Sequence, residues 1–341
     1  MMAKIITFGE IMMRLNPEGY RRIVQADRFE ASYAGGEANV AVSLAQYGET
    51  VSFVSKIPSH EVGQACVNSL RRYGVGTEHI VRGGDRLGIY FVEKGASQRA
   101  SKVIYDRANS AIALAKKSEF DWASVFEGVT WFHFTGITPA LGGDLPEICL
   151  EACKAAKERG VTISCDLNYR KKLWSREEAR ETMEKLIPYV DVCIANEEDA
   201  ADVFGIRAAD TDIDSGKLSK EGYISVAKQI CEKYGCRKVA ITLRSSISAT
   251  INNWAGMLYD GKEAFFSKEY SIHIVDRVGG GDSFGGALIH SQVQGWNSQR
   301  SIEFAVAASC LKHTIEQDFN LVSEAEVEAL AGGNGSGRVQ R

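Results

Sequence analysis

The stretch VDRVGGGDSFGGALIHS, from Val275 to Ser291, passes from three consecutive glycines into an apolar helical pattern. Gly279, Gly280 and Gly281 permit positive φ angles and let a ligand approach the backbone closely. A helix that begins after them leaves N–H groups without partners and carries the positive end of the helix dipole. The stretch therefore predicts an anion site, typically for phosphate, where the glycines meet the helix.

Asp282 follows these glycines directly and is expected to lie inside the anion site. A carboxylate at a helix N-terminus should stay ionised, so it can accept a proton. A proton acceptor beside a phosphate site suits phosphoryl transfer to a hydroxyl group. The alternative is a plain helix cap, in which Asp282 only binds backbone N–H groups. The glycines match neither a dinucleotide fingerprint nor a Walker A loop, because Phe284 replaces the last glycine and no Lys-Ser or Lys-Thr follows.

The composition of the 341 residues, with 45% hydrophobic residues and a net charge of −4, is typical of a globular enzyme and argues against non-specific nucleic-acid binding. No apolar run is long enough for a membrane span. The first residues, MMAKIITFGE, are expected to form the first strand and not a signal peptide. The eight cysteines form no C-x-x-C pair, which favours buried free thiols. We therefore expect a cytoplasmic protein without nucleic-acid or membrane partners.

Short apolar runs alternate with helical patterns over most of the chain. The expected strands are KIITFGEI, VSFVSKI, TWFHFTGI, VTISCDLN, VDVCIANE and KVAITL. This alternation predicts an α/β fold with a mostly parallel central sheet flanked by helices. Ligands of such sheets bind beyond the carboxyl ends of the strands.

Two segments, at about 12–33 and 87–107, interrupt the alternation with aromatic and β-branched residues. We interpret them as strands of a small second sheet that acts as a lid. Residues 1–331 are expected to form one domain, 210–221 a polar loop, and 332–341 a disordered tail. The stretch GMLYDGKE, around Asp260 and Gly261, predicts a β-hairpin.

A second glycine–helix junction, YAGGEANVAVSLAQYG, spans residues 33–48. Gly35 and Gly36 precede a helix that should begin near Glu37, with Asn39 in its first turn. Glycines here would let a small polar ligand reach the backbone. The alternative is a helix entry in which Asn39 only caps locally.

Taken together, the two junctions resemble the two signatures of the ribokinase-like (phosphofructokinase-B) family of carbohydrate kinases, through GGEANVA and DRVGGGDSF. The resemblance runs from about Lys4 to Leu330 and implies a Rossmann-like α/β domain with a β-sheet lid. It implies ATP and Mg²⁺ as cofactors, leaves a monovalent cation open, and implies transfer of the γ-phosphoryl group to a sugar hydroxyl. By this resemblance Asp282 is the catalytic base, and the backbone of Gly279, Gly280 and Gly281 forms the anion hole.

The same resemblance points to residues for the nucleotide and the metal. Asn196 and Asp199 match the N-x-x-E element of the family, but Asp199 is one methylene shorter than glutamate, so we expect it to meet Mg²⁺ through water. Nucleotide is expected beside KVAITL and RSIEFAVAASCLKHTI, which implies Thr242, Arg244 and Ala307.

Two positions depart from the family pattern. Gly280 stands where the family often has alanine, and Arg277 stands where it has threonine or proline. We interpret Arg277 either as an added positive charge near the phosphates or as the partner of a surface acid.

The stretch SCDLNYRKKLW follows an expected strand and carries Arg170, whose guanidinium could clasp a carboxylate with two hydrogen bonds. This stretch, with HFTGITPAL and IYDR, resembles 2-keto-3-deoxygluconate kinases of the same family. The resemblance implies phosphorylation of the 6-hydroxyl of that sugar acid, giving 2-keto-3-deoxy-6-phosphogluconate. The sugar-acid pocket is then expected to involve Gly35, Gly36, Asn39, Tyr90, Tyr105, Arg107 and Arg170.

Two alternatives stay open. A fructokinase or another neutral-sugar kinase would use the same machinery, and a sugar-binding protein without catalysis would not need Asp282. Tyr90 and Tyr105 fall on the expected lid strands, which suits closure over a small substrate. Because lid sheets of this family often pair between subunits, we expect a homo-oligomer, a dimer or larger.

Overall fold

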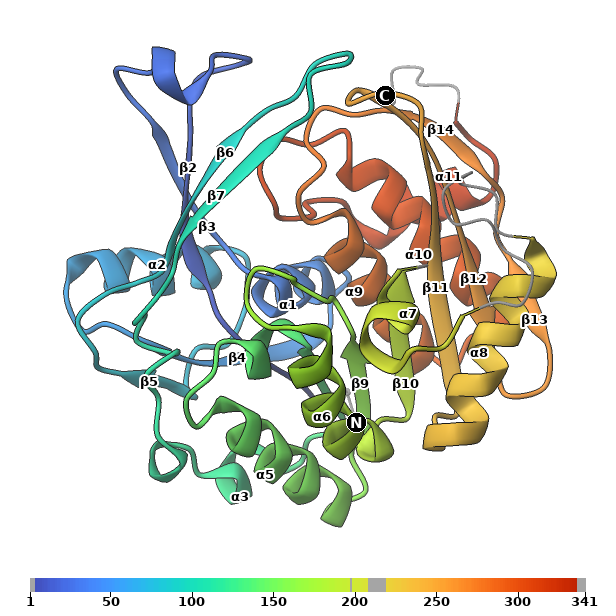
Figure 1. Ribbon diagram of the computed structural model, residues 1–341, viewed down its shortest axis with the longest axis horizontal. Coiled ribbons are helices and arrows are strands. Elements are labelled where there is room, and N and C mark those ends of the chain that lie inside the picture. The colour runs from blue at the N-terminus through green and yellow to red at the C-terminus, as the bar shows by residue number, and fades with distance from the viewer. Residues whose placement is uncertain (1–3, 197, 208–218, 336–341) are drawn as a thin grey trace.

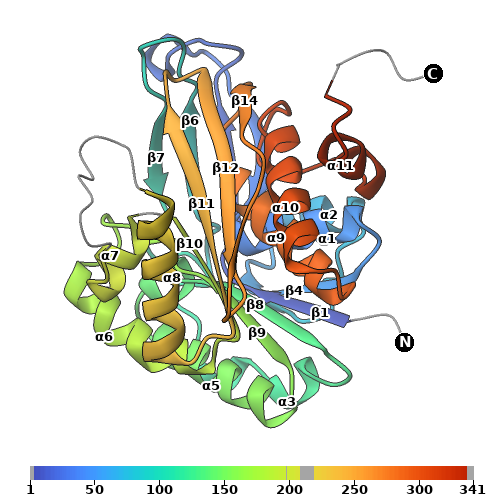
Figure 2. The same cartoon turned by 90° about the vertical axis from the view of Figure 1, so that its right-hand side faces the viewer.

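The computed structural model describes residues 4–196, 198–207 and 219–335, which form a central sheet between two layers of helices (Figures 1 and 2). The sheet is ten-stranded in this described part, in the order β13-β12-β11-β10-β9-β8-β1-β4-β5, with β14 beside β12. Its strands are β1 (Lys4–Phe8), β4 (Thr50–Ile57), β5 (Ile80–Arg82), β8 (Trp131–Thr135), β9 (Thr162–Asp166), β10 (Val192–Asn196), β11 (Lys238–Ser246), β12 (Ile251–Tyr259), β13 (Ala264–Phe266) and β14 (Tyr270–His273). Pairing is parallel from β5 to β11 and antiparallel beyond it.

The two helical layers bury one apolar cluster on each face of this sheet. One layer contains α1 (Gly36–Gln46), α2 (Glu61–Arg72), α9 (Gly280–Val293), α10 (Ser298–Lys312) and α11 (Glu324–Ala331). The other contains α3 (Trp122–Val125), α4 (Ile137–Ala140), α5 (Leu145–Glu158), α6 (Arg176–Leu186), α7 (Asp199–Phe204) and α8 (Lys220–Tyr234). Strands such as β8 are buried along their whole length, as expected for parallel strands covered on both faces. The predicted mostly parallel α/β fold is confirmed.

A second, four-stranded sheet stands apart from the central one, at the upper left of Figure 1. Its order is β3-β2-β6-β7, from β2 (Met12–Asn16), β3 (Glu30–Ala34), β6 (Ile89–Glu93) and β7 (Lys102–Asp106). These strands lie in the two segments that lacked helical periodicity. The chain enters this sheet directly after β1, so the small sheet lies at the carboxyl end of a central strand.

Several smaller expectations can also be compared with the structure. The predicted hairpin is present, because β12 pairs antiparallel with β13 and Gly261 turns with a φ of +92°. All eight cysteines are free. No helix in the described residues is both long and apolar enough to cross a bilayer. Most of the predicted loop 210–221, and residues 336–341 of the predicted tail, lie outside the described residues.

Candidate active site

The glycine turn before α9 presents backbone N–H groups at a helix start. Gly279 has a φ of +85°, and a Cβ there would lie 2.1 Å from the carbonyl oxygen of Asp318. Both the backbone conformation and the lack of space therefore require glycine. Within the described residues, the N–H groups of Gly281 and Asp282 have no hydrogen-bond acceptor. The turn can therefore bind an anion in the way the sequence predicted.

The end of α10 supports this turn from behind. Ser309 donates its hydroxyl to the carbonyl oxygen of Gly280 at 2.7 Å. The ring of His313 packs against Gly280 so closely that a Cβ there would meet it at 2.4 Å. Glycine in place of the family's alanine therefore matches a histidine ring that fills the space of the methyl group.

Asp282 connects the two glycine–helix junctions. Asn39 on α1 donates its amide to Oδ2 of Asp282 at 2.7 Å, although the two residues are 243 positions apart. The same Asn39 accepts a hydrogen bond from the N–H of Gly35 at 3.3 Å. A Cβ on Gly36 would lie 3.5 Å from Oδ1 of Asp282. The carboxylate thus has one oxygen held by an amide and the other facing a glycine.

The surroundings of Asp282 adjust its acidity. Burial raises the pKa of its carboxyl to about 6, and the hydrogen bond from Asn39 opposes this rise. The positive charges of Arg170 and Lys312 also lower the pKa. The carboxylate is therefore mostly ionised at pH 7 and can accept a proton, with a pKa near the working pH of a general base.

Two further acids near Asp282, the half-buried Asp166 and the buried Glu37, were missed in the sequence. Asp166 ends β9, and burial followed by the charges of Asp199 and Asp282 raises its pKa well above the ordinary value. Glu37 accepts hydrogen bonds from the hydroxyls of Thr135 and Thr138 at 2.9 and 2.6 Å. Burial raises the pKa of Glu37 to about 7.

A sequence signal existed for one of these acids. Asp166 stands at the carboxyl end of a parallel strand, where ligand residues of such sheets are expected. Nothing in the local pattern distinguishes Glu37 from an exposed acid in the first turn of a helix.

Asn196 and Asp199 form a compact turn after β10. The side-chain oxygen of Asn196 accepts from the N–H of Asp199 at 2.9 Å, and Oδ2 of Asp199 accepts from the N–H of Asn196 at 3.1 Å. The other oxygen of Asp199 accepts from the N–H of Tyr169 at 3.0 Å. The described residues contain no cluster of three potential metal ligands. This donor set fits Mg²⁺ only through water, which Mg²⁺ commonly keeps when it is bound with phosphates.

The residues expected at the nucleotide differ in accessibility. Thr242 pairs with Asn196 across β10 and β11, and Arg244 is exposed two residues further along β11. Ala307, in contrast, has no exposed surface, so a direct contact between Ala307 and a nucleotide cannot form in this conformation. Arg277 pairs with no surface acid in the described residues; it donates to the carbonyl oxygen of Ala249 at 3.0 Å. Burial and the positive charge of Arg244 lower the pKa of Arg277.

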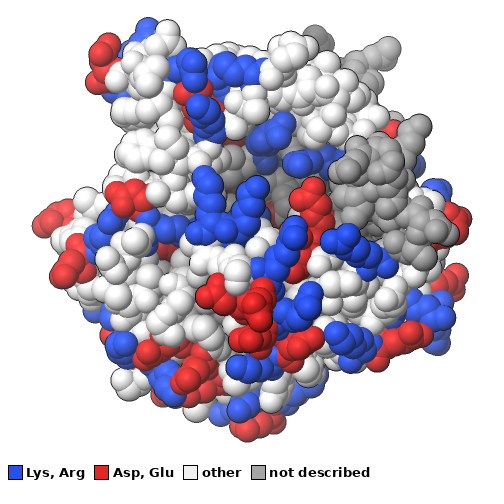
Figure 3. Space-filling view, in the orientation of Figure 1, with Lys and Arg blue, Asp and Glu red and all other residues white. Residues whose placement is uncertain are grey.

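A cavity of about 1140 Å³ opens beside the small sheet and includes three of the expected sugar-acid residues, Tyr105, Arg107 and Arg170. Figure 3 shows Lys and Arg side chains gathered around the hollow on this face. The basic side chains that line the cavity are Arg107, Arg170, Lys171, Lys172 and Arg176. Asp282 is not part of this lining, although the charge of Arg170 reaches it electrostatically.

The two arginines expected to bind the sugar acid differ in their partners. Arg107 forms an ion pair with the buried carboxylate of Glu10, with Nε at 2.8 Å, and its guanidinium lies over the ring of Tyr105. Arg170 is exposed and donates only to the neighbouring carbonyl of Tyr169, at 3.2 Å, among the described residues. Arg170 is therefore the arginine that is free to clasp a ligand.

Tyr90 is buried behind the wall of the cavity and does not line it. Its side chain is buried, and its hydroxyl donates to Asp318 at 2.9 Å. Its ring stacks on Tyr105 with 6.0 Å between centroids. In this conformation Tyr90 supports Tyr105, and only the ring of Tyr105 faces the cavity.

The sequence of the chain matches known proteins along most of its length. The family model for pfkB family carbohydrate kinases matches residues 2–319. A 2-dehydro-3-deoxygluconokinase from Thermotoga maritima has a similar solved structure, with a TM-score of 0.94, 52% identity, and coverage of 98% of this chain and 99% of its own.

Two other relatives share less of the sequence. A 2-dehydro-3-deoxygalactonokinase from Haloferax volcanii is 34% identical over 340 residues, which cover 99% of each chain. A fructokinase from Xylella fastidiosa, solved with bound ATP, has a TM-score of 0.76 at 22% identity and covers 98% of this chain and 99% of its own. At that identity the fructokinase supports only the fold.

Proposed function

The chain belongs to the pfkB family of carbohydrate kinases, and we propose that it transfers the γ-phosphoryl group of ATP to the 6-hydroxyl of 2-keto-3-deoxygluconate. The product is 2-keto-3-deoxy-6-phosphogluconate. The observation that carries the choice of a sugar acid is the free guanidinium of Arg170 in the cavity beside the small sheet. A carboxylate matches that guanidinium, whereas a neutral ketose does not.

Separate groups of the site accept the proton and bind the phosphoryl oxygens. Oδ1 of Asp282 faces Gly36, so it is the oxygen that takes the proton of the sugar hydroxyl, while Asn39 holds Oδ2. The oxygen of that hydroxyl forms the new bond to phosphorus as the bond to the leaving diphosphate breaks. The N–H groups of Gly281 and Asp282 and the positive end of α9 receive the charged phosphoryl oxygens. Mg²⁺ bound with ATP would neutralise phosphate charge, with Asp199 contacting it through water.

The wider assignments belong to the same proposal. Residues 1–331 form one kinase domain with the small sheet as its lid, Asn196, Thr242 and Arg244 lie near the nucleotide, and the protein works in the cytoplasm. The chain pairs through the small sheet into a homo-oligomer. Three exposed apolar side chains in that sheet and its β2–β3 connection support the pairing: Tyr20, Val24 and Ile104.

Two related substrates are the main competitors. The 2-dehydro-3-deoxygalactonokinase of Haloferax volcanii makes the epimer 2-keto-3-deoxygalactonate a second candidate. Fructose is the neutral alternative. An ADP-release assay across these three compounds ranks them by kcat/KM, and the proposal is refuted if fructose is preferred.

Arg170→Ala separates the sugar acid from the neutral sugar. A charge-assisted hydrogen bond is worth roughly 1.5–3 kcal/mol, so the loss in kcat/KM for the sugar acid should be roughly 10- to 150-fold. The value for fructose should change far less. Lys171→Ala is the control, because it removes one positive charge from the same cavity without removing the planar guanidinium. Equal losses for both sugars in Arg170→Ala would rule out carboxylate recognition by this residue.

A further inference from the structure

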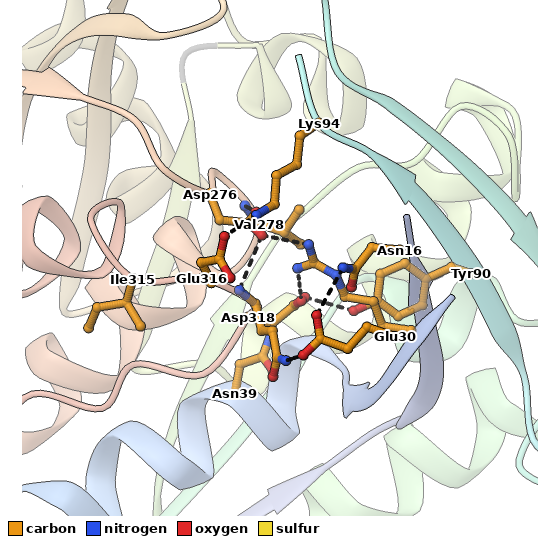
Figure 4. Close-up of polar contacts among 12 residues, drawn as sticks. Asn16, Glu30, Asn39, Tyr90, Lys94, Asp276, Val278, Ile315, Glu316 and Asp318 are labelled. Atoms are coloured by element: carbon orange, nitrogen blue, oxygen red, sulfur yellow. Dashed lines mark hydrogen bonds and ion pairs between the residues drawn. The ribbon is translucent and has the colours of Figure 1, made fainter. Parts of the chain in front are cut away.

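A network of buried charges lies behind the glycine turn, where the small sheet meets the loop after α10. Arg14 on β2 is fully buried and forms ion pairs of 2.5 Å with both Asp276 and Asp318. Tyr90 on β6 adds its hydroxyl to Asp318. Figure 4 shows Asp276, Asp318 and Tyr90 converging on this place. The network therefore joins the small sheet to the residues that flank the turn.

A second buried cation, Lys312, completes the network. It is the last residue of α10 and has no exposed surface. Its Nζ lies 3.4 Å from the carbonyl oxygen of Asp276 and 3.3 Å from that of Ile315. These distances are long for hydrogen bonds, so the contacts are mainly attractions between a charge and two carbonyl dipoles.

The charges of the network balance only if Lys312 is protonated. Asp276 and Asp318 carry two negative charges, and Arg14 supplies one positive charge. Burial lowers the pKa of Lys312 below its usual value, and the charges of Asp276 and Asp318 oppose this lowering. An uncompensated buried carboxylate would be strongly destabilising, so the positive charge of Lys312 stabilises the cluster.

The network also fixes the backbone of the glycine turn. One oxygen of Asp276 accepts from the N–H of Val278, and the other accepts from the N–H of Gln317, both at 3.2 Å. The carbonyl oxygen of Asp318 lies against Gly279. Any movement of the network would therefore move the N–H groups that receive the phosphoryl oxygens.

The same place would suit a monovalent cation, which the family resemblance leaves open. Such cations are held by rings of carbonyl and carboxylate oxygens. Here the ammonium group of Lys312 lies beside the carbonyl oxygens of Asp276 and Ile315 and takes the place that such a cation would need next to them. The residues present therefore do not fit a bound monovalent cation here.

We propose that Lys312 is a positioning residue that acts as a built-in cation behind the anion hole, so that turnover does not depend on a bound monovalent cation. This inference uses the proposed phosphoryl transfer but not the identity of the sugar. It applies equally to the gluconate, galactonate and fructose alternatives.

The first test uses the unmodified protein in chloride salts of potassium, sodium and tetramethylammonium at equal ionic strength. We expect the same kcat in all three, because the ammonium group of Lys312 already supplies the positive charge. Tetramethylammonium is the reference salt, since it is too large to enter a site lined by carbonyl oxygens. The melting temperature, which needs no substrate, should also be the same. A kcat or melting temperature that rises specifically with potassium would overturn the inference. Absence of turnover with every sugar would refute the proposed function. The melting temperatures would still show whether the protein binds a monovalent cation.

The second test uses Lys312→Ala, which leaves a cavity between the two carbonyl oxygens. In tetramethylammonium its kcat should fall roughly 10²-fold, because a misplaced anion hole costs about that much. Ammonium or methylammonium should restore part of the kcat and raise the melting temperature. Lys94→Ala is the matched control, since Lys94 bonds Glu316 of the same loop and should show no cation dependence. A folded Lys312→Ala with normal kcat, or with a loss that no small cation restores, would contradict the built-in cation.

Discussion

At the junction before α1, Gly35 has a φ of −176°, an extended conformation that any residue can adopt, whereas Gly279 before α9 turns with a φ of +85°. Both glycines lie against a carbonyl oxygen. A Cβ on Gly35 would lie 1.9 Å from the carbonyl oxygen of Glu10, and a Cβ on Gly279 would lie 2.1 Å from that of Asp318. The first junction is thus constrained by space alone, and the second by space and conformation. The first contributes the amide of Asn39, and the second contributes a carboxylate with free N–H groups. We infer that the first junction holds the acceptor sugar and the second carries out the chemistry.

The largest expected effect comes from removing the carboxylate of the second junction. Asp282→Asn keeps the shape but lacks the proton acceptor, so kcat should fall on the order of 10³-fold or more. Steady-state kinetics with a melting curve measure this. Glu198→Gln is the control, an exposed acid that lines the cavity. Near-normal kcat in Asp282→Asn would remove Asp282 from the base role.

A smaller effect separates the two glycines of the first junction. Gly36→Ala places a methyl group at van der Waals distance from Oδ1 of Asp282, where the acceptor hydroxyl should sit. We expect an unchanged melting temperature with a loss in kcat/KM on the order of 10²-fold. Gly35→Ala should instead destabilise the fold by roughly 1–3 kcal/mol, because it overlaps the Glu10 backbone. If the two variants show the same changes in melting temperature and in kcat/KM, Gly35 and Gly36 do not have the separate structural and catalytic roles assigned to them.

The smallest effect concerns pH. The base must be ionised, so kcat/KM should fall as the pH drops through about 6, the pKa of Asp282. The hydrogen bond from Asn39 lowers this pKa, so Asn39→Ala should move the acidic limb of the profile to higher pH. The measurement is kcat/KM between pH 5 and 8 for both proteins. An acidic limb that stays in place or moves to lower pH in the variant would show that Asn39 does not adjust the base.

Local patterns were sufficient to predict β1, β4 and β8 to β11 of the central sheet, because these strands are apolar along their length and end in glycine or polar residues. The short strands β5 and β14 were not predicted. The small sheet was predicted from the loss of helical period in two segments. The contact between Asn39 and Asp282 was beyond such patterns, since it joins side chains of two helices far apart in the chain. Arg14 and Lys312 were missed because a single charge on a strand, or in the last turn of a helix, ordinarily faces solvent.

Burial also explains the expectations that changed. Ala307 lies on a helix predicted to approach the nucleotide, but its side chain faces the apolar cluster beneath. Tyr90 lies on the predicted strand, yet its hydroxyl turns inward to Asp318. A sequence motif can predict a helix or strand without predicting which of its side chains are buried.

A competition assay tests the central claim most directly, that the two junctions together phosphorylate a sugar acid. The protein is mixed with ATP, Mg²⁺ and equal concentrations of 2-keto-3-deoxygluconate and fructose, and the products are followed by ³¹P NMR. We expect the phosphomonoester of 2-keto-3-deoxygluconate at its 6-hydroxyl to form first, with fructose phosphate appearing only after the sugar acid is nearly consumed. Earlier formation of fructose phosphate, or release of ADP without a phosphomonoester, would contradict the account.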